Sequence, residues 1–135
     1  RGSRRPPASR MNVLVDSSVW IAYFRGSDAA DRMDWLISEG LVATNDLILA
    51  ELLPSLLVRG ENRLARLLRE TVRFPLTPDW DDVIKLQTVC LRNGINKVGI
   101  PDLLIAQHVR QHRLCLYTLD RHFTLLSQYA SLNLL

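Results

Sequence analysis

Four acidic residues stand in apolar surroundings, where an ordinary surface carboxylate is not expected. Asp16 directly follows the apolar run 12–15, and Asp120 comes two residues after the apolar run 114–118. Ligands of open parallel α/β sheets gather at the carboxyl ends of the strands. If these two runs are neighbouring strands, the two carboxylates lie close together and can hold cations. The alternative is that each side chain only caps a helix, which contributes about 1 kcal/mol.

The other two acids lie inside apolar helical patterns. Glu51 sits among leucine, isoleucine and alanine in the segment 47–53, so most of this helix is expected to be buried. Burying an ionised carboxylate without a partner costs on the order of several kcal/mol, which a bound cation would offset. Asp102 follows Pro101 and precedes another apolar run, so we expect it to be semi-buried. The alternatives are a solvent-facing stripe for Glu51 and a helix cap for Asp102.

Four carboxylates in one crevice favour a divalent cation. They repel one another unless they are protonated or bind a positive charge, and oxygen donors of this kind suit Mg²⁺ or Mn²⁺. Such ions hold phosphate oxygens, lower the pKa of bound water and stabilise the charge that develops in displacement at phosphorus. The acids therefore predict hydrolysis of phosphodiester bonds.

The segments that carry these acids alternate between strand and helix patterns. Strands are expected at 12–15, 41–44 and 114–118, and an apolar run at 132–135 ends the chain. Helices are expected at 19–24, from a cap at Asp28 to Ile37, at 47–58 with a kink at Pro54, and at 62–71, 79–92, 101–112 and from about 121. Short apolar strands without internal alternation indicate a parallel sheet between helical layers. The fold class is α/β.

Composition narrows the class of protein. Residues 1–10 hold four arginines, and we interpret them as a vector-derived leader before a single domain at 11–135. Of 17 basic residues in the chain, 13 then remain against 14 acidic ones, so the excess positive charge does not itself indicate nucleic-acid binding. No apolar run is long enough to cross a membrane. Two cysteines without metal-ligand spacing indicate reduced thiols, and we expect a cytoplasmic protein.

The residues around the four acids resemble the PIN-domain ribonucleases, and in particular the VapC toxins of bacterial and archaeal toxin–antitoxin pairs. The similarity covers nearly the whole chain after Met11. It rests on four pieces in order: residues 11–21 with the first aspartate, Ala50-Glu51-Leu52, residues 99–106 with the third acid, and Tyr117-Thr118-Leu119-Asp120-Arg121-His122-Phe123. Each piece is weak alone, but the four together are fairly specific.

The resemblance implies a three-layer α/β/α PIN-like fold with a central, mainly parallel sheet of four to five strands. It also implies RNA cleavage assisted by Mg²⁺ or Mn²⁺, a homodimer, and a cognate VapB-like antitoxin that covers the active site. The chain departs from the commoner pattern at His122, where many members have a further aspartate, which puts a second metal ion in doubt. The catalytic and metal-binding residues carried over are Asp16, Glu51, Asp102 and Asp120, with Ser17 and Thr118 as supporting hydroxyls.

Two other functions remain open. Asp16 could be the covalent nucleophile of a metal-dependent phosphatase, but that mechanism needs a second aspartate where this chain has Ser18. The other alternative is a non-catalytic PIN-like interaction module whose acids only cap helices. Magnesium or manganese should raise the thermal stability of a true metal site and leave such a module unchanged.

Other side chains suggest weaker hypotheses. His108 and His112 are four residues apart, as zinc ligands can be, but no third ligand is evident, so exposed or RNA-facing imidazoles are preferred. Trp20, Trp35 and Trp80 lie in apolar helical patterns and are interpreted as core or dimer contacts. One arginine series at helical spacing could contact phosphates or form a solvated face paired with Glu61 and Glu70: Arg63, Arg66, Arg69 and Arg73.

Overall fold

The computed structural model describes residues 11–27 and 30–135; the predicted leader at 1–10 and the predicted cap at Asp28 lie outside the described residues. One five-stranded sheet has the order β3-β2-β1-β4-β5, and each pair of neighbouring strands is parallel. The strands are β1 (Val13–Val15), β2 (Val42–Thr44), β3 (Val72–Arg73), β4 (Cys115–Tyr117) and β5 (Asn133–Leu134). The predicted α/β class and parallel sheet are confirmed.

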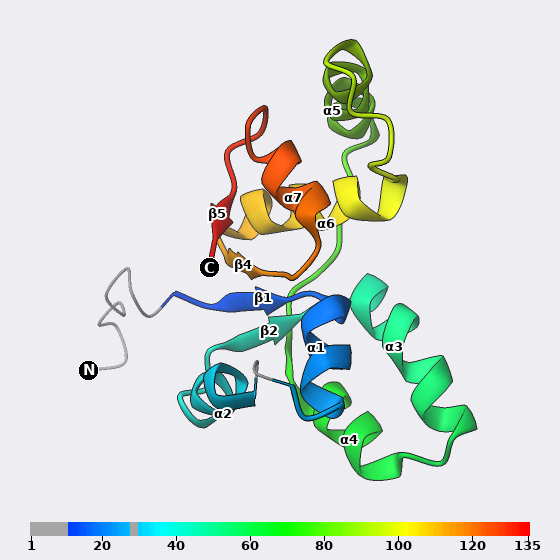
Figure 1. Cartoon of the computed structure of the whole chain (residues 1–135), viewed down its shortest axis with the longest axis vertical. Coiled ribbons are helices and arrows are strands. Elements are labelled where there is room, and N and C mark those ends of the chain that lie inside the picture. Colours follow the sequence, from blue (N-terminus) through cyan, green and yellow to red (C-terminus); the bar gives the residue numbers. More distant parts are fainter. Residues whose placement is uncertain (1–10, 28–29) are drawn as a thin grey trace.

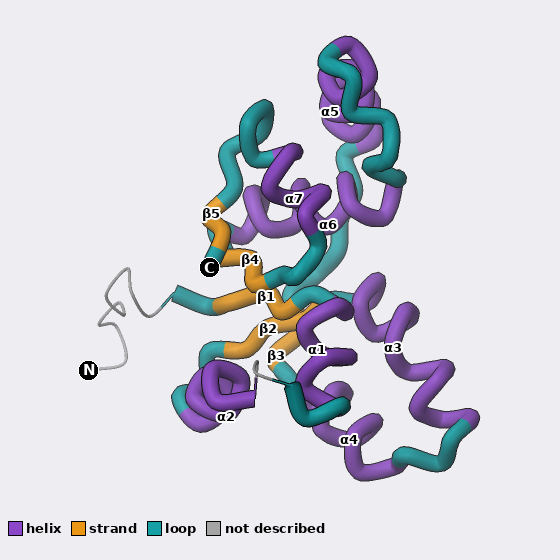
Figure 2. Tube along the Cα trace, viewed as in Figure 1, coloured by secondary structure: helices purple, strands orange, loops and turns teal. Residues whose placement is uncertain are grey.

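Helices cover both faces of this sheet, which gives the predicted three layers. In Figure 1, α1 to α4 lie on one side of the strands and α5 to α7 on the other, and Figure 2 shows the strands as the layer between them. The helices are α1 (Ser17–Phe24), α2 (Ala30–Ser38), α3 (Asp46–Val58), α4 (Asn62–Glu70), α5 (Trp80–Arg92), α6 (Ile100–His112) and α7 (Arg121–Leu126).

The central strands are apolar on both faces because both faces are covered. Leu14 and Val15 of β1 and Leu116 of β4 are fully buried, and β2 is buried along its whole length. Trp20 of α1 is also fully buried, as the interpretation of it as a core residue required. Trp35 and Trp80 are half exposed and do not belong to this core.

The two outer strands were not predicted. β3 and β5 have only two residues each, too few to show a recognisable pattern, and they exist because they pair with β2 and β4. The backbone N–H of Leu135 beyond β5 also donates to the Leu116 carbonyl at 2.8 Å. Edge strands this short are defined by their neighbours rather than by their own side chains.

The helix predicted at 47–58 is present, and one prediction about α6 is wrong. Asn45 caps α3, since its Oδ1 accepts from the Ile48 N–H at 2.9 Å, and the helix continues through Pro54. His108 of α6 was expected to be exposed, but it is 1% exposed and its Nε2 lies 3.2 Å from the Phe74 carbonyl oxygen. Burial of this imidazole makes it a structural residue of the α6 side of the sheet.

No helix within the described part of the chain is both long and apolar enough to cross a bilayer. Cys90 and Cys115 are both free thiols, as expected.

Candidate carboxylate site

The site lies where the order of the strands reverses relative to the chain. β1 is flanked by β2 on one side and β4 on the other, so the connections after β1 and β4 leave the sheet on opposite faces. Crevices outside the carboxyl ends of strands open at such switch points. β1 and β4 are paired, which is the condition under which Asp16 and Asp120 were expected to lie close together, and this pairing brings the residues after the two strands together.

Asp16 is a buried carboxylate held by hydroxyl groups. Its side chain is at the end of β1, the residue is 4% exposed, and Oδ2 accepts hydrogen bonds from Thr118 Oγ1 at 2.8 Å and Ser18 Oγ at 2.9 Å. Although Asp16 occupies the N-cap position of α1, its side chain makes no capping hydrogen bond. The interpretation of Asp16 as a simple helix cap is therefore wrong.

Thr118 connects Asp16 to Asp120. The Thr118 hydroxyl donates to Asp16 and accepts from the backbone N–H of Asp120 at 3.0 Å, so it sets the position of the loop after β4. Asp120 then caps α7, with Oδ1 accepting from the His122 N–H at 2.9 Å. Helix capping is thus correct for Asp120, and the cap orients its carboxylate beside the Asp16 hydroxyl network.

Asp102, Asp120 and His122 form the tightest cluster of possible ligands. One ligand atom from each lies within 4.8 Å of the others. His122 Nδ1 is 3.3 Å from Asp120 Oδ1 and 3.7 Å from Asp102 Oδ2. Asp102 lies in the first turn of α6 behind the N-cap Gly99, and its side chain is about one quarter exposed. His122 was noted in the sequence only as a departure from a pattern, and its position two residues after an acid was the available signal.

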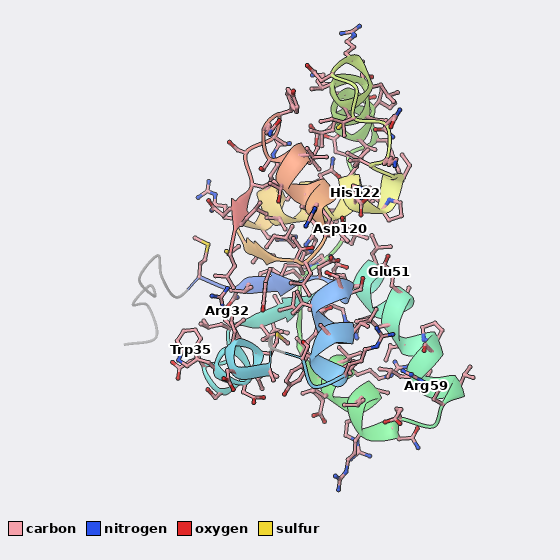
Figure 3. The ribbon with its side chains drawn as sticks, in the orientation of Figure 1. Arg32, Trp35, Glu51, Arg59, Asp120 and His122 are labelled. Carbon is pink, nitrogen blue, oxygen red and sulfur yellow. The ribbon has the colours of Figure 1, made fainter. Side chains whose placement is uncertain are left out.

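The exposure of Glu51 differs from the prediction. It is exposed rather than buried, so the solvent-facing stripe of α3 was the correct alternative. It nevertheless faces the same region as the other acids, close to Asp120 and His122 in Figure 3. Partial desolvation raises the pKa of the Glu51 carboxyl, the Asp16 charge raises it further, a side-chain hydrogen bond with Ser17 lowers it, and the Asp102 charge raises it.

The charges of neighbouring acids raise the pKa values of Asp102 and Glu51. Burial raises the pKa of Asp102, the Asp120 charge raises it further, the Gly99 backbone and His122 lower it, and the Asp16 charge raises it. The Asp16 charge therefore raises the pKa of both Asp102 and Glu51, although neither Asp16 nor Glu51 belongs to the cluster of Asp102, Asp120 and His122. Repulsion of this kind favours a bound cation.

The donor set suits a hard divalent cation. Carboxylate oxygens of Asp16, Asp102, Asp120 and Glu51 are the ligand type that Mg²⁺ and Mn²⁺ prefer, and the Nδ1 atom of His122 is a ligand more usual for transition metals. Oδ2 of Asp16 already accepts two hydroxyl hydrogen bonds, which orient the carboxylate. Hydrogen-bonded carboxylates of this kind are common among metal ligands.

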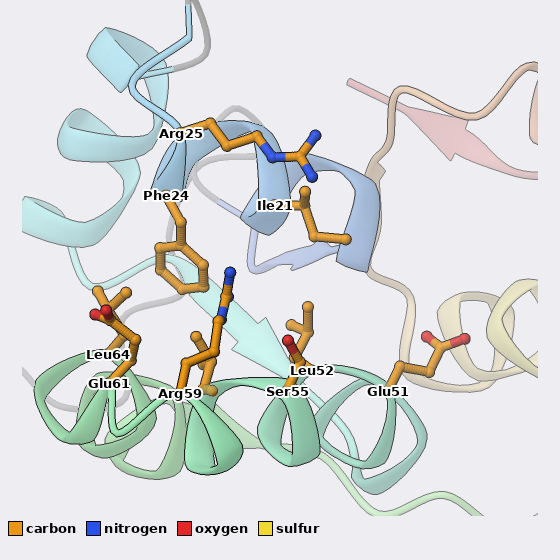
Figure 4. Close-up of a pocket in the computed structure, with 10 residues that line it drawn as sticks. Ile21, Phe24, Arg25, Glu51, Leu52, Ser55, Arg59, Glu61 and Leu64 are labelled. Carbon is orange, nitrogen blue, oxygen red and sulfur yellow. The ribbon is translucent and has the colours of Figure 1, made fainter.

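A groove leads away from Glu51 along the same side of the sheet. It has a volume of about 270 Å³ and runs between α1 and the α3–α4 pair, with apolar walls from Ile21, Phe24 and Leu64. Figure 4 shows Glu51 at one end and Arg25 and Arg59 farther along. Glu51 therefore belongs both to the candidate site and to the lining of this groove.

A family model described as the PIN domain matches residues 13–128. The chain belongs to the PIN-domain family. The match spans all four acids, both flanking strands and α7, so this PIN domain includes the whole carboxylate site. The comparison with curated proteins finds no match.

Solved structures with the same fold come from toxin–antitoxin complexes. A member of the VapBC family, VapBC-5 from Mycobacterium tuberculosis, is 26% identical with a TM-score of 0.68, and covers 93% of this chain and 98% of that one. VapBC2 from Rickettsia felis, bound to a promoter DNA fragment, is 16% identical with a TM-score of 0.72 over 93% and 98%. VapC20 from M. tuberculosis, a sarcin–ricin-loop-cleaving toxin, is 19% identical with a TM-score of 0.58 over 84% and 94%. The chain is thus a VapC-like PIN domain.

Proposed function

We propose that this PIN domain is the toxin of a type II toxin–antitoxin pair and hydrolyses RNA phosphodiester bonds with Mg²⁺ or Mn²⁺. The observation that carries the proposal is the convergence of Asp16, Asp102 and Asp120 from three separate parts of the chain. Without a cation the like charges of these acids repel one another, which lowers the stability of the folded protein. A similar fold belongs to a toxin named for cleaving the sarcin–ricin loop.

The acids and the hydroxyl groups have different roles in this proposal. Asp16, Asp102, Asp120 and Glu51 bind the metal, which when present supplies charge to the phosphate and acidifies water. The Thr118 and Ser18 hydroxyls hold the Asp16 carboxylate, and Ser17 holds Glu51. Glu51 is exposed on α3, so it is the acid best placed to accept a proton from an incoming water molecule.

The test combines metal binding with RNA cleavage. Thermal melting is measured with and without Mg²⁺ or Mn²⁺, and cleavage of total RNA is followed for the wild type, Asp16→Asn and Asp120→Asn. We expect the metals to raise the Tm of the wild type, and both variants to lose cleavage and most of that rise. Asp81→Asn is the matched control, since this acid lies on α5 outside the cluster.

A folded wild type that shows no metal-dependent change of Tm and no RNA cleavage would contradict the proposal and leave the non-catalytic interaction module. Full cleavage by Asp16→Asn at saturating metal would also overturn it. Release of phosphate from phosphomonoesters without RNA cleavage would instead favour the phosphatase alternative. That mechanism requires an aspartate at the position that Ser18 occupies.

A VapB-like antitoxin is proposed as the partner, and the groove that begins at Glu51 is the surface it covers. Expression of the wild type alone should arrest growth, and co-expression of the small protein encoded beside it should restore growth. Ile21→Asp places a charge in the groove wall and should weaken co-purification while RNA cleavage is retained. Harmless expression of an active enzyme would contradict the toxin assignment.

A homodimer is also proposed, and α5 offers the surface for it. Trp80, Ile84 and Leu91 lie on one side of this helix and are 56%, 62% and 57% exposed. We call these three residues the α5 stripe. An apolar stripe of this kind on a helix that otherwise packs on α6 is typical of an association surface.

A further inference from the structure

A second hollow adjoins the carboxylate cluster on the side opposite the Glu51 groove. It has a volume of about 470 Å³, within the roughly 300–1,000 Å³ typical of ligand pockets. Its walls come from the segment that joins α5 to α6 and from α7 and the turn that follows it. The residues that matter for its chemistry are Asn93, Asn96, Lys97, His122, Gln128 and Tyr129.

The charge of this hollow differs from that of the neighbouring surfaces. Among the described residues, its walls include Lys97 and no carboxylate, whereas the first groove has two carboxylates, Glu51 and Glu61, beside two guanidinium groups, Arg25 and Arg59. RNA is a polyanion, and residues 11–135 of the chain carry slightly more acidic than basic residues. A surface beside the acids that carries a lysine and no carboxylate does not repel the phosphates of an RNA strand.

The walls of the hollow match the requirements of an unpaired nucleotide. Tyr129 is 42% exposed, so its ring presents a face on which a base can stack. Asn93, Asn96 and Gln128 supply amide groups that both donate and accept hydrogen bonds, as base edges require. Ile95 and Leu125 add apolar lining to the hollow.

The hollow is held in place by hydrogen bonds of its own framework. Gln87 Nε2 on α5 donates to the Val98 carbonyl at 3.1 Å, and Val98 is buried. The Ile95 N–H donates to the Cys90 carbonyl at 2.8 Å, and the Tyr129 N–H donates to the Leu126 carbonyl at 3.0 Å. A preformed wall reduces the entropy lost when a ligand binds.

His122 joins the hollow to the proposed cleavage site. The residue lines the hollow, and its Nδ1 lies 3.3 Å from Asp120 Oδ1 (Figure 3). We propose that the hollow binds one unpaired RNA nucleotide next to the cleaved bond, with Tyr129 stacking on its base and Lys97 contacting a phosphate. This inference rests on the proposed function and adds to it the residues that select the sequence at the cut.

Tyr129 is tested by substitution in a binding assay and a cleavage assay. Binding of a fluorescent pool of random single-stranded RNA 12-mers is measured in the cleavage-deficient Asp16→Asn background, and cleavage of the same pool is measured in the wild-type background. Tyr129→Ala should weaken binding about tenfold and raise KM more than it lowers kcat, because a stacked base loses its platform. Tyr129→Phe keeps the ring and should stay near wild type. Trp35→Ala is the control for loss of an exposed aromatic ring elsewhere, on α2.

The chain contains only two lysines, which makes Lys97 testable against a matched control. Lys97→Gln should lower RNA affinity and reduce the slope of affinity against salt concentration by about one. Lys85→Gln removes the same charge from the exposed surface of α5 and should change neither. Sequencing of the RNA ends should show that Tyr129→Ala cuts beside different nucleotides from those that the wild type prefers.

Three outcomes would overturn the inference. If Tyr129→Ala and Lys97→Gln match their controls while the wild type cleaves RNA and gains Tm from Mg²⁺, the hollow is not a nucleotide site and the proposed function stands. If these variants lose only inhibition by the co-encoded antitoxin, the hollow is a protein-binding surface. If the wild type neither binds nor cleaves RNA, both proposals fail together.

Discussion

At the scale of single residues, the Thr118 hydroxyl has the largest number of roles in the site. It donates to Asp16 Oδ2 at 2.8 Å, accepts from the Asp120 N–H at 3.0 Å and lies 3.5 Å from Ser18 Oγ. The hydroxyl thus links the residues after β1 with those after β4. Its removal disturbs two acids at once.

Thr118→Val should therefore lower metal affinity or RNA cleavage by about 10- to 100-fold, the range typical of residues that orient metal ligands. Valine has the same shape but leaves the Asp120 N–H without its acceptor and Asp16 with one donor fewer. Thr118→Ser retains the hydroxyl and should stay within a few-fold of wild type. Calorimetric titration with Mn²⁺ and initial cleavage rates measure both effects. If Thr118→Val has the Mn²⁺ affinity and cleavage rate of the wild type, the hydrogen bonds of Thr118 do not contribute to metal binding or cleavage.

Asp102→Asn should stabilise the metal-free protein while abolishing cleavage. Burial and the Asp120 charge raise the pKa of Asp102 above its ordinary value, so the ionised carboxylate destabilises the folded state. This destabilisation is present above the folded-state pKa and disappears as the pH falls through it. At neutral pH, asparagine should raise the metal-free Tm by on the order of a few degrees and reduce the gain from Mg²⁺. An unchanged or lower Tm, with Asp81→Asn as control, would contradict this.

At the scale of secondary-structure elements, two polar side chains fix α6 to the segments around it. Gln107 is 3% exposed, and its Oε1 accepts from the Asp79 N–H while its Nε2 donates to the Asp79 carbonyl and to Asp82 Oδ2. These bonds hold the beginning of α5 against α6. His108, one residue later, holds α6 to the segment after β3 through the Phe74 carbonyl. The position of Asp102 at the start of α6 depends on both contacts.

His108 should make the fold sensitive to mild acid. Burial lowers the pKa of His108, the Phe74 backbone raises it, the neighbouring His112 lowers it, and the Pro75 backbone raises it. Nδ1 of the buried ring has no hydrogen-bond partner among the described residues, so a proton added there is not compensated. Because the folded-state pKa lies below the unfolded-state value of about 6.5, the unfolded state takes up the proton first. Stability should therefore fall as the pH drops below about 6.5 and level off below the folded-state pKa.

The measurement is chemical denaturation at pH values from 8 to 5. His108→Gln can still donate to the Phe74 carbonyl and should flatten the loss of stability in this range. His112→Gln is the control, because His112 is less buried and its Nε2 contacts the Pro75 carbonyl oxygen at 2.8 Å. Parallel pH profiles for wild type and His108→Gln would show that other groups cause the acid sensitivity.

At the scale of the whole molecule, the α5 stripe is expected to form the dimer. Ile84→Asp places a charge between Trp80 and Leu91 and should convert the dimer to a monomer at micromolar concentration, because burying an unpaired carboxylate is unfavourable. Light scattering after size-exclusion chromatography measures the mass. Lys85→Gln, on the adjacent position but outside the stripe, should remain a dimer. A monomeric wild type, or a dimeric Ile84→Asp variant, would contradict this use of α5.

Local patterns determined the class of fold and the segments that carry the acids. Apolar runs without alternation predicted buried parallel strands, and the order of strand, acid and helix predicted that Asp16 and Asp120 each follow a strand. Both features depend on residues close together in the sequence, because side-chain periodicity reports how a segment is covered.

Only the tertiary structure decided how the side chains meet. The Thr118–Asp16 hydrogen bond joins residues 102 positions apart, and His122 reaches toward Asp102 of another helix. Glu51 was expected to be buried and His108 exposed, and both were wrong because burial depends on which helix face packs against the sheet. β3 and β5 were not predicted, because a strand of two residues is too short to show the periodicity of side chains on which the prediction depends. Contacts between distant segments follow from packing and pairing, which a local pattern does not contain.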